Sequence, residues 1–202
     1  MMLRRLVVFL VVPIAVAAAC ADGPTAPPPA SAALLNSLPA ATGAAAVQIS
    51  PALVAGGEEV LVNMLDNCDP DSFNAVLGAG ACVRSGGMTF DDFIAQLSRL
   101  TFVAPWRFAP QHSSIRVGQT FVARNKGGEV HTFTPVDEFG GGIVPILNQL
   151  AQVPNVAPEC TALGADDFVA PGGVSRVEAG SAGTSKFQCC IHPWMRLEAS
   201  VR

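Results

Sequence analysis

The stretch Phe187–Met195, which reads FQCCIHPWM, combines three chemically distinct side chains in a short segment. Cys189, His192 and Met195 offer a thiol, an imidazole and a thioether within seven residues, so one tight turn can aim all three at a single point. Two soft sulfurs and an imidazole suit copper, and one more imidazole completes a trigonal His₂Cys set with a weak axial Met. We expect His131 to supply it, so the sequence predicts a site for one copper ion that cycles between Cu(I) and Cu(II).

Residues 1–19 have the organisation of a signal peptide. Met1–Arg5 is basic, Leu6–Ala19 is apolar, and three alanines precede Cys20. The Ala-Ala-Ala-Cys sequence resembles the lipobox of bacterial lipoproteins, whose cysteine carries the lipid; ordinary cleavage at an A-x-A site, releasing a soluble protein, is the alternative. We favour lipid on Cys20, which predicts an exported protein anchored to a membrane of the bacterial cell envelope, on its periplasmic or cell-surface side. Residues 20–57 are rich in alanine and proline and are expected to form a tether.

Charge and composition argue against a nucleic-acid partner and against enzymatic catalysis. The chain has 12 Lys and Arg against 16 Asp and Glu. Removal of residues 1–19 takes away Arg4 and Arg5, which lowers the net charge from −4 to −6. Without a basic patch or tail, binding to nucleic acid is not expected. The sequence contains no Ser/His/Asp arrangement, carboxylate pair or phosphate loop, and its three histidines cannot build the additional copper centres of an oxidase. It therefore does not predict an enzyme.

Six cysteines occur in a chain that is expected to be exported, where disulfides persist; they are Cys20, Cys68, Cys82, Cys160, Cys189 and Cys190. If Cys20 carries lipid and Cys189 binds copper, an even number remains. Cys68 and Cys82 bracket a predicted helix and are expected to pair, which leaves Cys160 to pair with Cys190. The alternative is a disulfide between the neighbours Cys189 and Cys190, which would abolish the copper site.

Residues 58–105 are expected to form a small helical extension braced by a disulfide. Asp69 and Pro70 are a favourable N-cap and first residue for a short helix, which Gly78 can end. Apolar residues at helical spacing predict a second helix over residues 90–100. The extension either packs on the main domain as an ordinary structural element, which is the simpler interpretation, or covers the copper site and offers a docking surface.

From Trp106 onward the pattern changes to short segments of alternating apolar and polar residues, separated by glycine and proline. Such segments are typical of β-strands, and they lie near residues 115–117, 121–123, 130–133, 174–177, 184–189 and 197–201. Short strands with frequent turn signals favour an antiparallel β-sandwich. Residues 106–202 are therefore expected to be mainly β.

The segment PQHSSIRVGQTFVARNKGGEVHTF, followed by FQCCIHPWMR, resembles the type 1 (blue) copper cupredoxins, especially amicyanin and plastocyanin, over about residues 106–202. The resemblance implies a cupredoxin-like Greek-key β-sandwich. In the family the first copper histidine follows a strand that ends in asparagine, as Asn125 does here, and the remaining ligands come from a Cys-x-x-His-x-x-Met loop. The resemblance therefore implies the ligand set His131, Cys189, His192 and Met195.

The chain departs from the family near the site. Thr132 stands where asparagine is common, and its hydroxyl is expected to hydrogen-bond near the sulfur of Cys189. The insertion between His131 and Cys189 is longer than in amicyanin and carries Cys160. An exposed far edge of His192 would make that residue the first ligand to be lost at low pH.

Three functions are compatible with these features. An electron carrier would hold one copper and exchange single electrons with a redox partner that the sequence does not identify. The alternative is a copper-binding or delivery protein of the periplasm or cell exterior, for which the metal is cargo. A structural or interaction lipoprotein with a degenerate site would bind no stoichiometric copper. The resemblance favours the electron carrier.

Overall fold

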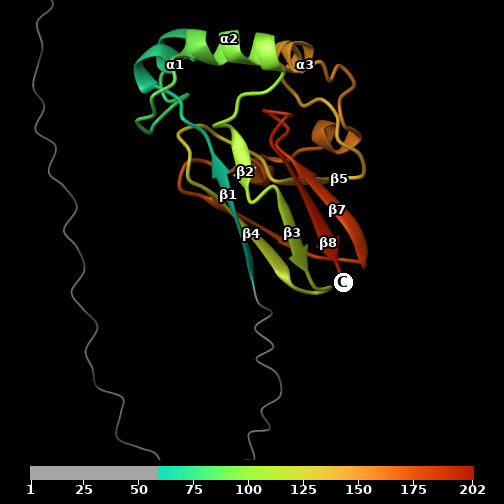
Figure 1. Cartoon of the computed structure of the whole chain (residues 1–202). Helices are drawn as coiled ribbons and strands as arrows, with labels where there is room; N and C mark the ends of the chain where they lie inside the picture. The colour runs from blue at the N-terminus through green and yellow to red at the C-terminus, as the bar shows by residue number, and fades with distance from the viewer. Residues whose placement is uncertain (1–58) are drawn as a thin grey trace, which may run out of the picture. The chain divides into compact units, whose positions relative to one another are not determined.

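The computed structural model describes residues 59–202, and the predicted signal peptide, Cys20 and the tether over residues 20–57 lie outside them. Two four-stranded β-sheets face each other, with the helices gathered at one end and the C-terminus at the other (Figure 1). The β-sandwich predicted from the sequence is confirmed. Within residues 59–202 no helix has both the length and the apolar character needed to cross a membrane.

The first sheet has the strand order β2-β1-β4-β6 and the second has the order β3-β8-β7-β5. Both sheets are mixed rather than purely antiparallel, because β1 runs parallel to β4 and β3 runs parallel to β8. The strands of the first sheet are β1 (Val60–Leu65), β2 (Arg107–Ala109), β4 (Thr120–Asn125) and β6 (Val174–Glu178). Those of the second are β3 (His112–Ile115), β5 (Thr134–Val136), β7 (Gly183–Gln188) and β8 (Arg196–Val201).

Strand β1 lies in the part of the chain that the sequence analysis assigned to a helical extension. It occupies the middle of the first sheet, where Val60 pairs with Phe121 and Met64 pairs with Asn125. Val62 and Met64 are fully buried while Leu61 is exposed, which is the alternation of a strand with one face on a core. Residues 59–202 accordingly belong to one compact unit, not to an extension and a separate sandwich.

Both predicted helices are confirmed. Helix α1 (Pro70–Leu77) begins at Asp69, whose side chain accepts a hydrogen bond from the Ser72 N–H, and ends at Gly78, where φ is 103°. Helix α2 (Phe90–Leu100) begins at Thr89, whose side chain accepts a hydrogen bond from the N–H of Asp92. Its apolar face points inward, because Phe93 and Leu97 are buried.

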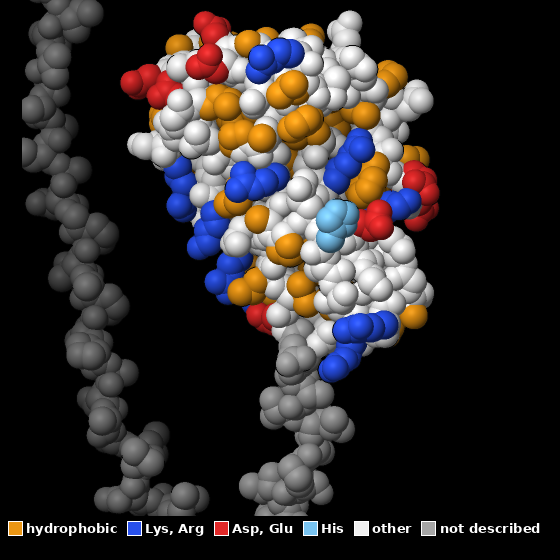
Figure 2. Space-filling view, in the orientation of Figure 1, with side chains coloured by type: hydrophobic (Ala, Val, Ile, Leu, Met, Phe, Trp, Pro, Cys, Tyr) orange, Lys and Arg blue, Asp and Glu red, His pale blue; other side chains and the backbone are white. Residues whose placement is uncertain are grey.

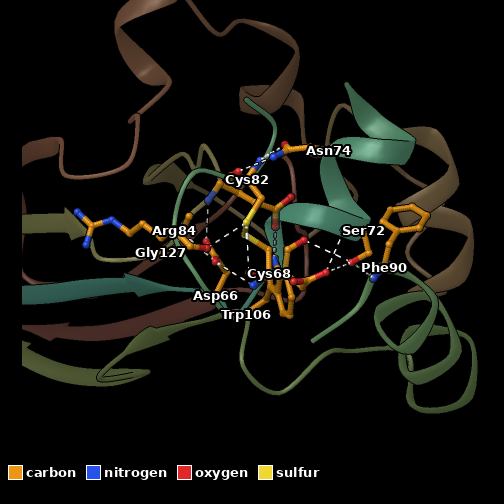
Figure 3. The surroundings of a disulfide bond; sticks show 12 residues. Asp66, Cys68, Ser72, Asn74, Cys82, Arg84, Phe90, Trp106 and Gly127 are labelled. Atoms are coloured by element: carbon orange, nitrogen blue, oxygen red, sulfur yellow. Dashed lines mark hydrogen bonds between the residues drawn. A yellow bond between two sulfur atoms is a disulfide. The ribbon is translucent and has the colours of Figure 1, made fainter. Parts of the chain in front are cut away.

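The helices are held on the sandwich by aromatic packing. The ring of Phe73 stacks on Trp106 at a centroid distance of 5.8 Å, and Phe93 lies 4.8 Å from the same indole. Burial of a side chain of this size contributes about 1.5–3 kcal/mol. The Cys68–Cys82 disulfide lies beside Trp106 (Figure 3).

The segment between β4 and β6 differs from the sequence-based expectation. Residues 130–133 were predicted as a strand, but His131 forms a single bridge to Val169, and the regular strand β5 begins only at Thr134. The insertion that follows contains helix α3 (Pro145–Leu150) and two short 3₁₀ turns, Pro158–Thr161 and Ala165–Asp167. The Cys160–Cys190 disulfide ties this insertion to the end of β7.

Candidate metal centre

The segment Cys189–Met195 is a tight loop that joins β7 to β8. The backbone N–H of Cys189 donates to the carbonyl of Met195 at 3.0 Å, and the N–H of Met195 donates to the carbonyl of His192 at 2.9 Å. These bonds close the loop on itself, so its three predicted ligand residues lie on one compact turn. All three are buried, with 0% exposure for Cys189 and Met195 and 3% for His192.

His131 reaches the same place from the turn that follows β4. The buried side chain of Asn125 shapes this turn: its Nδ2 donates to the carbonyls of Glu129 at 2.7 Å and Val169 at 2.8 Å. Its Oδ1 accepts from the N–H of Gly127 at 2.9 Å. The asparagine predicted to precede the first histidine therefore holds the turn that presents His131.

The three nearest donor atoms have separations that fit a small trigonal metal ion. The Cys189 Sγ lies 3.8 Å from Nδ1 of His131 and 3.8 Å from Nδ1 of His192. Imidazole nitrogen and thiolate sulfur bind first-row ions such as zinc at roughly 2.0–2.3 Å, so three such donors in a plane with the ion lie roughly 3.5–4.0 Å apart. The donor set of two imidazoles and one cysteine sulfur, with a buried thioether in the same loop, matches copper.

The cysteine sulfur receives a hydrogen bond from backbone. The N–H of Thr132 donates to the Sγ of Cys189 at 3.4 Å. The Thr132 hydroxyl was expected to hydrogen-bond near this sulfur, and it accepts from the N–H of the adjacent Cys190 at 2.8 Å. Thr132 therefore contacts the sulfur with its main chain and fixes the loop at Cys190 with its side chain.

The pKa values of His131 and Cys189 are both shifted by the groups around them. Burial by itself lowers the pKa of His131, but hydrogen bonds to Asp66 and Cys189 outweigh it and raise this pKa to about 9. Burial by itself raises the pKa of Cys189, but the hydrogen bonds and charges of His131 and His192 lower it well below its usual value. The two histidines thus favour the thiolate of Cys189, the form that binds metals.

Asp66 is a residue of the candidate site that the sequence analysis missed. Its Oδ2 lies 2.9 Å from the Nε2 of His131, on the ring edge opposite the cysteine. The same carboxylate accepts backbone N–H groups from Gly128 at 2.9 Å, Glu129 at 3.0 Å and Cys68 at 3.3 Å. Burial by itself raises the pKa of Asp66, yet the hydrogen bonds from His131 and the backbone lower it to about 2. A carboxylate in this position fixes the ring orientation and the tautomer of a metal-binding histidine.

Two glycines allow the turn before His131 to approach Asp66 closely. A Cβ atom on Gly127 would collide with the carboxylate of Asp66, and one on Gly128 would lie 2.7 Å from the Sγ of Cys68. Figure 3 shows Asp66 between Gly127 and the Cys68–Cys82 disulfide. The disulfide therefore belongs to the scaffold that positions His131.

Glu129 occupies the corresponding position beside the second histidine. Its Oε2 lies 3.6 Å from the Nε2 of His192 and accepts a hydrogen bond from the Nε1 of Trp106 at 2.5 Å. Burial is the main reason that the pKa of Glu129 is raised. Each imidazole therefore has its Nδ1 directed at the cysteine sulfur and its Nε2 directed at a buried carboxylate.

The sequence carried weak signals for both carboxylates. Asp66 directly follows an apolar run, and Glu129 stands two residues before His131. An acidic residue at the end of a strand or in a glycine-containing turn is usually solvated. Nothing local distinguishes these two from exposed residues such as Asp166, because their burial depends on segments that are distant in sequence.

The far edge of His192 is covered, which corrects the expectation that it could be exposed. The His192 ring lies 6.4 Å from Phe93 of α2, 6.5 Å from Trp106 and 5.6 Å from Trp194, between ring centroids. With 3% of the residue exposed, the aromatic side chains exclude solvent from this ligand. The sequence analysis gave two interpretations of residues 58–105: simple packing on the main domain, or a cover over the candidate site. The position of Phe93 against His192 supports the cover.

The cysteines are arranged as the counting argument predicted. Cys68 pairs with Cys82, Cys160 pairs with Cys190, and Cys189 is free and buried. The neighbours Cys189 and Cys190 are not linked, because Cys190 is already paired with Cys160. Asp66, Cys68 and Glu129 also form a group with metal-binding chemistry, but Cys68 is already in a disulfide and cannot act as a thiolate ligand.

No protein-family model and no curated protein matches the chain. Among solved structures it is similar to a novel purple cupredoxin from Nitrosopumilus maritimus, at 12% identity and a TM-score of 0.40, over 71% of this chain and 99% of that one. Amicyanin from Paracoccus versutus is similar at 18% identity and a TM-score of 0.32, over 48% and 73% of the two chains. Oxidised plastocyanin from Dryopteris crassirhizoma is similar at 14% identity and a TM-score of 0.33, over 48% and 89%. These TM-scores lie below 0.5, and the β-sandwich of this chain is shown by its own two four-stranded sheets.

Proposed function

We propose that the protein binds one copper ion and carries single electrons in the cell envelope. The observation that supports this most directly is a buried, unpaired cysteine whose sulfur lies 3.8 Å from the Nδ1 atoms of two histidines. His131, Cys189 and His192 would hold the ion, with Met195 as the weak axial ligand. Copper would supply a one-electron couple at this site.

The residues around the site would hold the proposed ligands in place while the copper changes its oxidation state. Asp66 and Glu129 hold the two imidazoles from their outer edges, and Asn125 fixes the turn that carries His131. The loop hydrogen bonds between Cys189 and Met195 fix the other ligands. A rigid site that favours neither oxidation state fully requires little rearrangement on electron transfer.

The test is a visible spectrum of protein produced from residue 21 onward, with one equivalent of Cu(II) added. We expect an intense thiolate-to-copper charge-transfer band and one tightly bound copper per chain. Cys189→Ser should abolish the band, whereas the Cys160→Ser, Cys190→Ser double variant should retain it. A Cys189→Ser variant that keeps the band would refute the assignment of the ligand.

Copper delivery is the alternative function, and the burial of the ligands favours the electron carrier over it. Cargo must leave the protein readily, but the Cys189, His131 and Met195 side chains are fully enclosed. The two functions differ in a measurable way, because a carrier retains its copper through repeated oxidation and reduction. Loss of copper to a competing thiol chelator within a few cycles would favour delivery.

Attachment to a membrane through lipid on Cys20 is part of the proposal. The three alanines before this cysteine support it. Cys20→Ala should release the protein from the membrane fraction or block its processing, as judged by fractionation and mass spectrometry. Mature wild-type protein that is wholly soluble and carries an unmodified Cys20 would contradict this part of the proposal.

A further inference from the structure

A redox partner must bring its own centre close to the metal, yet the candidate ligand His192 is enclosed. His192 is 3% exposed and is surrounded by Phe93, Trp106 and Trp194. A partner therefore cannot contact an imidazole edge directly. It has to approach over one of the aromatic side chains that contact His192.

Trp194 is the partly exposed member of this aromatic enclosure. Its ring lies 5.6 Å from the His192 ring, and Trp194 also lines a groove of about 600 Å³. The floor and walls of this groove include Phe102, Trp106 and Val153. Phe102 is 46% exposed, so an apolar surface is available for contact one aromatic ring away from the candidate ligand.

The charged residues that line this groove are both basic. They are Arg107 on β2 and Arg196 at the start of β8, on a chain whose net charge is −4. Arg107 is exposed, with its guanidinium hydrogen-bonded to the carbonyls of Ala104 and Pro105. In Figure 2 hydrophobic and basic side chains share the face below α2. An apolar centre with positive charges at its rim complements an acidic surface.

We propose that this groove, which we call the Trp194 groove, docks the acidic face of a redox protein and that Trp194 connects that partner to the metal centre. The proposal rests on the proposed electron-carrier function. One electron passes from the reduced site through His192 and Trp194 to the oxidised centre of the partner, while no bond forms or breaks and no proton moves. Small, transient contacts with steering by charge are usual for such encounters.

The experiment uses two forms of one redox protein that differ only in surface charge: native cytochrome c, and cytochrome c whose lysines have been succinylated. Stopped-flow absorbance follows reduction of each ferricytochrome by the Cu(I)-loaded full chain at low ionic strength. Arg107→Glu should lower the rate constant for the succinylated form about tenfold, the lower end of electrostatic steering effects. It should leave the rate constant for the native form unchanged or raise it.

A matched control is available on the opposite edge of the same sheet. Arg176 lies on β6 with its side chain 57% exposed, and Arg176→Glu introduces the same charge change away from the groove. This variant should leave the ratio of the two rate constants close to that of the wild type. Added salt should remove the effect of Arg107→Glu, because the Debye length falls to about 8 Å at 0.15 M.

A second variant in the groove distinguishes an effect of charge from an effect of disturbing the structure of β2 at Arg107. Ala104 is exposed and lines the groove without touching a ligand residue, so Ala104→Glu should also slow the succinylated form selectively. Equal effects of Arg107→Glu and Arg176→Glu, or no selectivity between the two cytochromes, would overturn the docking proposal. If the copper band is intact in these experiments, the proposed function still stands. Absence of the band in wild-type protein would instead refute the proposed function itself.

Discussion

Replacement of Asp66 by asparagine tests the buried ion pair behind the metal centre. Asparagine preserves the size of the side chain and keeps one oxygen that can accept from the N–H groups of Cys68 and Gly128. It replaces the other oxygen by an NH₂ group and removes the charge that faces the Nε2 of His131 at 2.9 Å. The Asp66 side chain is 2% exposed, so water does not screen this interaction as it would a surface pair. We expect Asp66→Asn to destabilise the metal-free protein.

The magnitude follows from the pKa of Asp66, which falls from 3.8 to about 2 in the folded protein. This shift corresponds to about 2 kcal/mol, since one pKa unit is worth about 1.4 kcal/mol. Because the folded-state pKa of Asp66 is depressed, its stabilisation is present above pH 3.8 and is lost as the pH falls through about 2. The pKa of His131 is instead raised from 6.5 to about 9, so its contribution is present below pH 6.5 and is lost as the pH rises through 9.

The assay is urea unfolding of the metal-free protein with its disulfides intact, at pH values from 2 to 10. Asp66→Asn should lower the free energy of unfolding by about 2 kcal/mol at pH 5.5, where both charges are present. The difference from wild type should shrink toward pH 2 and again above pH 9. Asp166→Asn, at an exposed position, is the matched control and should show no such pH dependence. A difference of equal size at every pH would refute the ion-pair reasoning.

Three further predictions concern the same site. Copper affinity should rise about tenfold per pH unit between pH 7 and 9, because the ion must displace the proton of His131, and a competing chelator titration measures this. Asp66→Asn should also raise the reduction potential, measured by voltammetry, since a buried negative charge favours Cu(II) over Cu(I). The Cys160→Ser, Cys190→Ser double variant should keep the copper band but lose about 2–4 kcal/mol of stability in urea unfolding; loss of the band would contradict this prediction.

Local chemistry and local periodicity explain what the sequence predicted correctly. The donors Cys189 and His192 lie in one short loop, and the cysteine pairing follows from counting. The helix over residues 90–100 follows from the spacing of its apolar residues and from the cap at Thr89. Each of these inferences needs few residues and no knowledge of what packs against them.

The features that the sequence did not reveal depend on contacts between distant segments. The run Val60–Leu65 is apolar at every position except Asn63, so it lacks the alternation that marks a strand with one buried face. Its partner β4 is parallel, so no hairpin turn marks the pairing. Asp66 follows that strand and becomes buried only when the turn around Gly127 folds over it. An error in placing β1 therefore led directly to the omission of Asp66.

The segment assigned to an extension contributes structure, ligand support and solvent exclusion at once. Strand β1 completes the first sheet, Asp66 holds the outer edge of His131, and Phe93 on α2 covers His192. Because the cover leaves Trp194 as the partly exposed ring beside His192, it also determines where a partner can approach. The stability of the proposed ligand set and the proposed place of electron exchange thus depend on the same part of the chain. Substitutions at Asp66 and in the Trp194 groove therefore test separate consequences of one arrangement.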